Sequence, residues 1–366
     1  MKVLHVLDRL DRGGTEMLVL DILNFSYKKD LDVYVVAMGN GVLLDEFRKN
    51  NSKFFLIQRQ YPIDIFAIFK LIKLIRKEKI DVVHCHITTV SLHVYLASFF
   101  IKIKLVQSFH GYLESAKKYN RISQFLINQF NANIAVSKGF LKRLKDQSKF
   151  NTMKNFHIVY NGVDVLKFNN ISVVQREEFK IKENDILFGM VGNFMTWKDQ
   201  ITICKALPYI ISKYPYFKFV FVGAQSKQEP YLYENCVNFC INNNISDNVL
   251  FLGQRTDVIK ILFTLDGFVF STVEDTFGLA LVEAMMVGLP TIVSDIPPLL
   301  EISDNGKYSK IFKLFDHEDL QSKIEELIIN VEKRQELGAM GQNWVLSKFT
   351  IEKHIQELNK LYQSLF

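Results

Sequence analysis

The chain has 366 residues, of which 48% are hydrophobic and 23% are charged. A chain of this length and apolarity exceeds what one hydrophobic core usually covers, so two domains are expected. The composition excludes an intrinsically disordered protein, a collagen and a disulfide-stabilised miniprotein.

Charge is distributed unevenly along the chain. Residues 1–160 carry 25 Lys and Arg against 13 Asp and Glu, a net charge of +12, whereas the remainder carries 20 against 26, a net charge of −6. A basic half joined to an acidic half predicts that the basic half meets an anionic partner. The four cysteines form no Cys-x-x-Cys pair, so they are expected to be reduced thiols in a cytoplasmic protein.

Short runs of β-branched and aromatic residues alternate with amphipathic stretches in the first half. This rhythm predicts parallel strands joined by helices. The uncharged segment 82–101 contains three histidines and is too polar for a membrane span, so it is predicted to be a strand followed by a helix. The expected strands are 3–7, 33–38, 54–57, 82–86, 105–109, 134–136 and 157–160.

The rhythm stops between residues 161 and 185, where a polar segment begins with the turn-forming pair Asn161-Gly162. This segment is expected to connect two domains. A second series of strands is predicted at 186–191, 219–223, 249–253, 267–270, 291–294 and 311–315.

The predicted fold class is α/β, with two doubly wound, Rossmann-like lobes and a ligand cleft between them at the carboxyl ends of the strands. The first lobe is expected at residues 1–165 and the second at residues 166–347. A helix at 348–366 is expected to pack back on the first lobe.

The stretch from 266 to 301 carries the most chemical information. It predicts a strand, an acidic loop and a helix over residues 278–287. The backbone N–H groups of Phe277, Gly278 and Leu279 would lie at the amino end of this helix. Unpaired donors and the helix dipole favour an anion such as phosphate there.

Two carboxylates flank the start of this helix. Asp275 and Glu283 are eight residues apart, so both can face one ligand, and carboxylates accept hydrogen bonds from sugar hydroxyls. The alternative is that Asp275 caps the helix and Glu283 is a solvated helix residue. The apolar neighbours of Glu283 favour a functional role, because a buried carboxylate needs a partner.

These residues resemble the acidic motif of the family 4 (group 1) retaining glycosyltransferases of the GT-B type. The resemblance extends over the whole chain through motifs that are weak singly and specific in this order. They are Gly13-Gly14-Thr15-Glu16, Asp81-Val82-Val83-His84 with His86, Phe109-His110-Gly111, Ala135-Val136-Ser137, Asn161-Gly162-Val163-Asp164 with Phe168, Val191-Gly192, Lys198, Phe221-Val222-Gly223, Phe251-Leu252-Gly253, Glu283-Ala284-Met285 and Gly288-Leu289-Pro290.

The resemblance implies an enzyme that transfers a sugar from a nucleotide diphosphate sugar to a glycan or lipid-linked acceptor. It also implies retention of anomeric configuration, and no metal ion or other cofactor. The first lobe would then bind the acceptor and the second lobe the nucleotide sugar, in the synthesis of a cell-surface polysaccharide.

The family pattern assigns roles in the second lobe. By this resemblance Glu283 would hold the ribose hydroxyls, catalytic Asp275 would lie beside the transferred sugar, and Lys198 would contact the diphosphate. Taken alone, Lys198 reads equally as a surface lysine. The chain departs from the pattern because Asp275 replaces the usual glutamate, with Glu274 one residue earlier, and because Asn193 replaces an arginine.

In the first lobe the resemblance places His110 beside the donor sugar as a second catalytic residue. The glycines Gly13 and Gly14 would let the backbone approach the same phosphates, because they have no Cβ atom. Without the resemblance, Gly-Gly after a strand reads as a turn and a histidine at a strand end as structural.

Two patterns suggest a metal ion without establishing one. His84 and His86 fall on one face of a strand, but no third ligand is in evidence, so no metal site is predicted. The Asp30-Leu31-Asp32 triplet matches the Asp-x-Asp pattern of metal-dependent glycosyltransferases but precedes a strand, away from the expected cleft.

The helix predicted at 65–79 carries Lys70, Lys73 and Lys77 on one stripe, together with Phe66 and Leu74. This mixture predicts binding to an anionic membrane surface, and its alternative is an ordinary helix with exposed lysines. Nucleic acid is not an expected partner, because no binding module accompanies the charge. A cytoplasmic protein, peripheral at the inner face of the cell membrane, is therefore expected.

Other functions stay open at this point. A sugar-nucleotide epimerase or a phosphorylase would use the same two-lobed fold, and a membrane-bound scaffold would keep the lobes without catalysis. An NAD-dependent oxidoreductase is disfavoured, because Gly13 and Gly14 do not belong to a Gly-x-Gly-x-x-Gly fingerprint.

Overall fold

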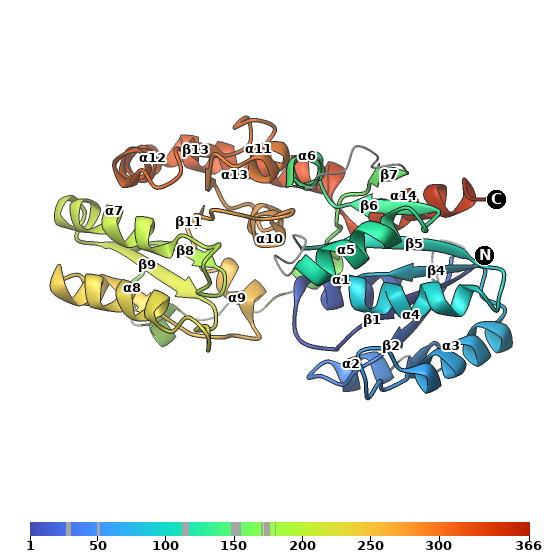
Figure 1. Cartoon of the computed structure of the whole chain (residues 1–366). Helices are drawn as coiled ribbons and strands as arrows, with labels where there is room; N and C mark the ends of the chain where they lie inside the picture. The colour runs from blue at the N-terminus through green and yellow to red at the C-terminus, as the bar shows by residue number, and fades with distance from the viewer. Residues whose placement is uncertain are drawn as a thin grey trace. The chain divides into compact units, whose positions relative to one another are not determined.

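The computed structural model describes residues 1–26, 31–49, 52–111, 117–147, 155–169, 171, 176–179 and 181–366. Contacts between residues divide the chain into two compact units. Unit 1 comprises Met1–Asp164 and Phe349–Phe366, and unit 2 comprises Val165–Lys348. Each unit contains one parallel sheet with helices against its faces (Figure 1).

The sheet of unit 1 has seven strands in the order β3-β2-β1-β4-β5-β6-β7. Strand β1 pairs with both β2 and β4, and its register places His5 beside His84. The strand order reverses between β1 and β4, which leaves a crevice at the carboxyl ends of these strands. The strands are β1 (Lys2–Leu7), β2 (Asp32–Ala37), β3 (Phe54–Leu56), β4 (Val82–Cys85), β5 (Lys104–Phe109), β6 (Ala132–Ala135) and β7 (Phe156–Ile158).

Helices cover both faces of this sheet, so alternate strand residues enter two apolar cores. Val3, Val33 and Val82 lie in one core and Leu4, Val36 and Val83 in the other. The helices are α1 (Gly14–Phe25), α2 (Leu44–Arg48), α3 (Ile65–Glu78), α4 (Thr88–Ser98), α5 (Lys117–Ile127), α6 (Lys138–Gln147) and α14 (Ile351–Gln363).

Helix α14 belongs to unit 1 although it follows unit 2 in the sequence (red in Figure 1). Thr350 caps it, and Val163 donates a backbone hydrogen bond to the carbonyl of Phe349 at 2.9 Å. The helix packs against α1 and contributes Ile355 and Leu358 to the core that contains Val3. The core of unit 1 is therefore completed by residues that follow unit 2 in the sequence.

The sheet of unit 2 has six strands in the order β10-β9-β8-β11-β12-β13, and its order reverses between β8 and β11. The strands are β8 (Ile186–Val191), β9 (Phe217–Val222), β10 (Val249–Phe251), β11 (Gly267–Phe270), β12 (Thr291–Ser294) and β13 (Lys310–Phe312). The helices are α7 (Gln200–Lys213), α8 (Tyr231–Asn242), α9 (Val258–Leu262), α10 (Leu279–Met286), α11 (Pro297–Ile302), α12 (His317–Ile329) and α13 (Val331–Lys348).

The predicted α/β fold of two doubly wound lobes is confirmed, and every predicted strand is present with its ends shifted by at most three residues. Residues 82–101 form β4 and α4, as expected. The described part of residues 161–185 contains only short 3-10 turns at Val165–Phe168 and Arg176–Phe179. Among the described helices, none has both the length and the apolarity needed to cross a bilayer.

Candidate functional site

In unit 2, the loops after β8 and β11 meet at the carboxyl edge of the sheet. Lys198 and Thr272 form an antiparallel bridge, and the Thr272 hydroxyl donates to the carbonyl of Trp197 at 2.7 Å. These bonds hold the two loops together at the point where the strand order reverses. Open α/β sheets bind their ligands in this crevice.

A nearly buried ion pair lies in this crevice. The ammonium of Lys198 is 2.7 Å from Asp275 Oδ2, and the two side chains are only 11% and 18% exposed. The same ammonium lies 4.4 Å from the centre of the Phe270 ring, and Asp275 Oδ1 accepts the N–H of Phe277 at 3.1 Å. The structure thus brings two predicted site residues, 77 positions apart in sequence, into direct contact.

Helix α10 starts at Leu279, with Gly278 as its N-cap at a φ of 101°. A Cβ atom on Gly278 would lie 2.9 Å from Leu299 Cδ2, so glycine is required by both conformation and space. The alternative that Asp275 caps the helix is therefore wrong. The N–H groups of Leu279 and Ala280 belong to the first turn, where no intrahelical carbonyl can accept them.

The remaining predicted acids lie on either side of this turn. Glu274 and Glu283 are both half-buried, so the expectation that Glu283 is a buried carboxylate is wrong. Residues Leu281, Val282, Ala284 and Met285 carry the buried face of α10. Glu283 lies on the opposite, accessible part of the helix, where a ligand can reach it.

Asn193 has a structural role at the end of β8. Its Oδ1 accepts the N–H of Ala224 at 2.8 Å, and its carbonyl accepts from Gln200 Nε2 at 3.2 Å. The side-chain oxygen therefore holds the loops after β8 and β9 together.

The sequence analysis assigned no role to Asp199, which follows Lys198. Its two carboxylate oxygens accept the hydroxyls of Thr202 and Ser271, each at 2.9 Å, and burial raises its pKa. These bonds fix the loop that carries Lys198 to the end of β11. Its contact with Ser271 depends on strand order, which sequence alone does not reveal.

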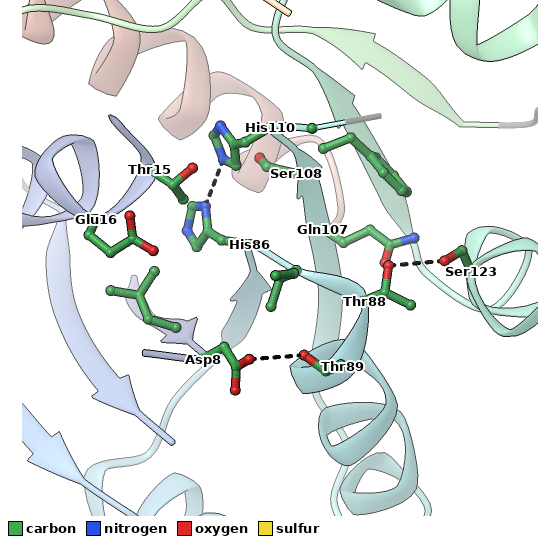
Figure 2. A pocket seen from close by; sticks show the side chains of 14 residues that line it. Asp8, Thr15, Glu16, His86, Thr88, Thr89, Gln107, Ser108, His110 and Ser123 are labelled. Carbon is green, nitrogen blue, oxygen red and sulfur yellow. Dashed lines mark hydrogen bonds between the residues drawn. The ribbon is translucent and has the colours of Figure 1, made fainter. Parts of the chain in front are cut away.

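In unit 1, a pocket of about 380 Å³ lies over the crevice between β1 and β4. Figure 2 shows Thr15 and Glu16, from the start of α1, on one side of it, and Thr88, Gln107 and Ser123 on the other. Hydroxyl, amide and carboxyl groups dominate the polar lining. Such a lining suits a ligand rich in hydroxyl groups.

Gly13 and Gly14 lie at the start of α1, beside this pocket. Gly13 is the N-cap, and a Cβ atom there would lie 2.5 Å from Glu16 Oε2. The glycine therefore makes room for Glu16 to turn back over the helix start, and burial raises the pKa of that carboxyl. Asp8, on the other side of the opening, is neutralised by a two-point contact with Arg59 at 3.0 and 3.1 Å.

His110 lies in the pocket at the end of β5, as predicted, and belongs to a chain of histidines. Its Nε2 is 3.0 Å from His86 Nδ1 (Figure 2), and His86 Nε2 is 2.8 Å from His5 Nδ1. Burial lowers the pKa of His5 and of His110 to about 3, so both rings are neutral near pH 7. His5 is not among the residues predicted from the sequence, although a histidine between Leu4 and Val6 in a buried strand is itself a signal.

The statement that no third ligand accompanies His84 and His86 is wrong, because His5 brings a ring nitrogen within 4.8 Å of theirs. The geometry is nevertheless that of a hydrogen-bonded network. The rings of His84 and His86 are stacked at 4.4 Å and 26°, so their lone pairs do not converge. The two nitrogens of His84 contact the Tyr362 hydroxyl at 2.6 Å and the Ser108 hydroxyl at 2.7 Å.

The described part of the Asp-x-Asp triplet lies away from the unit 1 crevice. Asp30 lies outside the described residues. Asp32 begins β2 at the opposite, amino edge of the sheet, where Lys53 pairs with it at 2.9 Å.

Helix α3 exposes a larger apolar surface than its sequence predicts. Phe66, Lys70, Lys73 and Lys77 are exposed as expected, but the placement of Leu74 on this face is wrong, because Leu74 is buried. We call the exposed face the α3 surface. It comprises Tyr61, Ile63, Ile65, Phe66, Phe69, Lys70, Lys73 and Lys77.

Two family models match the chain one after the other. The model for Glycosyltransferase Family 4 matches residues 12–166, and the model for Glycosyl transferases group 1 matches residues 173–344. Together these matches contain every predicted site residue.

Relatives and solved structures agree with this assignment. The chain is 26% identical to an Escherichia coli UDP-Gal:alpha-D-GlcNAc-diphosphoundecaprenol alpha-1,3-galactosyltransferase, with 99% of this chain and 96% of the relative covered. It is 23% identical to the capsular polysaccharide biosynthesis glycosyltransferase CapM of Staphylococcus aureus, with 93% and 92% covered. The crystal structure of Anabaena HepE in complex with UDP and glucose superposes with a TM-score of 0.86 at 18% identity and covers 100% of both chains. The chain therefore belongs to the group 1, family 4 glycosyltransferases and is an enzyme with the two-lobed GT-B fold.

Proposed function

We propose that this glycosyltransferase moves a sugar from a nucleotide diphosphate sugar to a glycan or lipid-linked acceptor, with retention of anomeric configuration and without a bound metal ion. The observation that carries the proposal is the ion pair of Lys198 and Asp275 beside the amino end of α10. The name of the Escherichia coli relative contains a UDP-sugar donor and a lipid diphosphate acceptor, and the Anabaena structure contains UDP and glucose.

The unit 2 crevice supplies positive potential where the leaving group develops charge. When the sugar–phosphate bond breaks, negative charge accumulates on the departing diphosphate, and fixed donors stabilise it most in a site with little water. Lys198 and the first-turn N–H groups of α10 are such donors. Glu283 would accept hydrogen bonds from the ribose, and Asp275 would face the sugar once Lys198 contacts the diphosphate.

The unit 1 pocket would bind the reacting hydroxyl groups. Its lining of Thr88, Gln107 and Ser123 donates and accepts hydrogen bonds without a formal charge. His110 lies in this pocket and would contact a sugar oxygen. No carboxylate of this pocket is assigned as a nucleophile, so a covalent glycosyl-enzyme is not part of the proposal.

A thermal-shift screen against uridine, guanosine and adenosine diphosphates and their sugars tests the proposal. One nucleotide at a hundred times its Kd is expected to stabilise the protein by about 2.7 kcal/mol, a rise in Tm of roughly 5–10 °C, with EDTA present. If the Tm does not rise with any of these nucleotides, the proposed function is contradicted. Epimerisation of the donor alone, or a requirement for free phosphate, favours the alternative enzymes on the same fold.

We also propose that the α3 surface binds an anionic membrane at the cytoplasmic face, in the synthesis of a cell-surface polysaccharide. Phe66 and Phe69 are 77% and 59% exposed, and Ile65 is 62% exposed. Exposed aromatic and aliphatic side chains next to lysines suit the boundary between acyl chains and anionic headgroups. A lipid-linked acceptor would be met at this boundary.

Vesicle sedimentation measures this binding directly. The protein is expected to bind vesicles that contain anionic lipid at low salt and to dissociate from them at high salt. It is not expected to bind neutral vesicles. The double variant Phe66→Ser/Phe69→Ser is expected to lose at least about tenfold in affinity, because two apolar side chains no longer enter the bilayer. Ile329→Ser in unit 2, where Ile329 is 66% exposed, is the matched control and keeps full binding. Equal vesicle binding by the wild-type protein, the double variant and Ile329→Ser contradicts the proposal.

A further inference from the structure

The unit 1 pocket is acidic, although the first half of the chain is strongly basic. Among the described residues that line it there is no Lys or Arg, whereas the carboxyls of Asp8 and Glu16 face it (Figure 2). Lys70, Lys73 and Lys77 of the same unit belong to the α3 surface instead. The charge of the pocket is therefore opposite in sign to that of the half of the chain that forms it.

The two carboxyls of the pocket differ in their surroundings. Arg59 donates to the two oxygens of Asp8 at 3.0 and 3.1 Å, and the hydroxyl of Thr89 donates to the same group at 3.4 Å. Burial raises the pKa of Glu16, and the neighbouring negative charges of Asp11 and Asp8 raise it further. Further negative charge beside Glu16 is therefore unfavourable.

The amino end of α1 is the part of the pocket that would otherwise attract an anion. Glu16 already covers it. Its Oε2 lies 2.5 Å from the position that a Cβ atom of Gly13 would take, and its carboxyl accepts the N–H of its own residue. The helix start is thus occupied by a negative group of the protein itself.

The histidines of the pocket do not offset this charge. Burial lowers the pKa of His110 to about 3 and holds the pKa of His86 well below its ordinary value. Both rings are neutral near pH 7, and an incoming anion would gain a cation only by protonation of a buried ring. Neither ring therefore favours an anionic ligand.

We infer that the part of the acceptor that enters the unit 1 pocket is an uncharged sugar unit, whose hydroxyl groups donate hydrogen bonds to Glu16. A phosphate or a uronic carboxylate would instead lie beside Glu16, where none of the described lining residues supplies a cation. The hydroxyls of a neutral sugar also match Thr88 and Gln107, which donate and accept. This substrate class rests on the proposed function, but the charge selectivity of the pocket can be measured without it.

Saturation-transfer NMR with matched pairs of sugars tests the inference on the full chain. The probes are methyl glucoside with methyl glucuronide, and methyl galactoside with methyl galacturonide, which differ in one exocyclic hydroxymethyl or carboxylate group. At least one neutral glycoside is expected to bind, and its uronic partner is expected to bind at least about tenfold more weakly. Equal binding within the pairs overturns the inference, and so does failure of both neutral glycosides to bind.

Glu16→Gln keeps the size of the side chain and one acceptor oxygen but removes the charge. The preference for the neutral sugar is expected to fall by about tenfold, because the uronic partner is no longer repelled. A purely structural role would lower the Tm and leave this preference unchanged, which overturns the inference. Glu352→Gln is the matched control and keeps the preference, since Glu352 is also a half-buried carboxyl in the first turn of a unit 1 helix but lies outside the described lining of the pocket.

Thr88→Val decides the question if Glu16→Gln does not fold. The Thr88 hydroxyl lies across the pocket from Glu16, 3.0 Å from the hydroxyl of Ser123 (Figure 2). Its loss removes a hydrogen bond without changing any charge, so both members of a pair are expected to bind roughly two- to tenfold more weakly. Loss of the preference in Thr88→Val would assign the selectivity to that side of the pocket and overturn the role of Glu16.

The outcomes separate this inference from the proposed function. If the neutral sugars are preferred but no nucleotide raises the Tm, only the proposed function is contradicted. If a nucleotide binds but the uronic sugars bind as well as the neutral ones, only the inference about the acceptor is contradicted.

Discussion

Replacement of Lys198 by Met is expected to weaken binding of the nucleotide diphosphate and to lower kcat/KM by roughly 10²–10³-fold, the usual effect of removing one donor to a developing negative charge. The variant is also expected to be less stable, because Asp275 is only 18% exposed and loses the cation 2.7 Å away. Isothermal titration with the diphosphate and steady-state kinetics measure the two losses separately.

Variants at Asp275 distinguish a binding site from a structural ion pair. Asp275→Asn is expected to keep nucleotide affinity, because Lys198 stays, and to lose turnover. The double variant Lys198→Met/Asp275→Asn is expected to recover stability without recovering activity. Lys310→Met is the matched control, since Lys310 and Glu326 form an ion pair at 2.9 Å on another part of unit 2. Full activity in Lys198→Met would contradict the assignment of the unit 2 crevice as the site that binds the nucleotide diphosphate.

Acidification is expected to destabilise unit 1 before unit 2. Burial lowers the pKa of His5 and His110 to about 3 and of His354 to about 4, and it lowers the pKa values of His84 and His86 as well. Each ring is neutral when folded but binds a proton near pH 6.5 when unfolded, so stability falls as the pH drops below about 6.5. At pH 5 each such histidine lowers the free energy of unfolding by about 2 kcal/mol.

The two tryptophans allow the units to be followed separately. Trp197 and Trp344 are the only tryptophans of the chain and both belong to unit 2. At pH 5, far-UV circular dichroism is expected to report partial unfolding at urea concentrations where tryptophan fluorescence is still native. His354→Asn keeps a donor for the Tyr160 carbonyl and should take up about one proton fewer on unfolding. If the circular dichroism and fluorescence transitions coincide at both pH 5 and pH 7.5, acid does not destabilise unit 1 before unit 2.

The sequence predicts most of the fold because strands buried on both faces read as continuous apolar runs. The strand ends at Gly267–Phe270 and Thr291–Ser294 are predicted without error. Errors in the strands occur at their ends. A different error concerns the side of helix α3 on which Leu74 lies, because Leu74 is four residues after Lys70 and yet packs with Leu71 and Ile75 in the core.

Pairs of site residues could not be predicted, because they depend on which strands are neighbours. Lys198 meets Asp275 only because β8 lies beside β11, and His5 meets His86 only because β1 lies beside β4. Lys198, Asp275 and His86 followed from motifs, whereas His5 and the contacts within each pair required the sheet order.

The placement of α14 in unit 1 has a consequence for biosynthesis. A ribosome makes residues 165–348 before it makes Ile355, Leu358 and Tyr362, which fill the core of unit 1. The hydroxyl of Tyr362 also contacts His84. Although most of unit 1 is synthesised first, it therefore cannot complete its core until the last helix of the chain has been made. This order departs from the common pattern in which the N-terminal domain folds before the next one is synthesised.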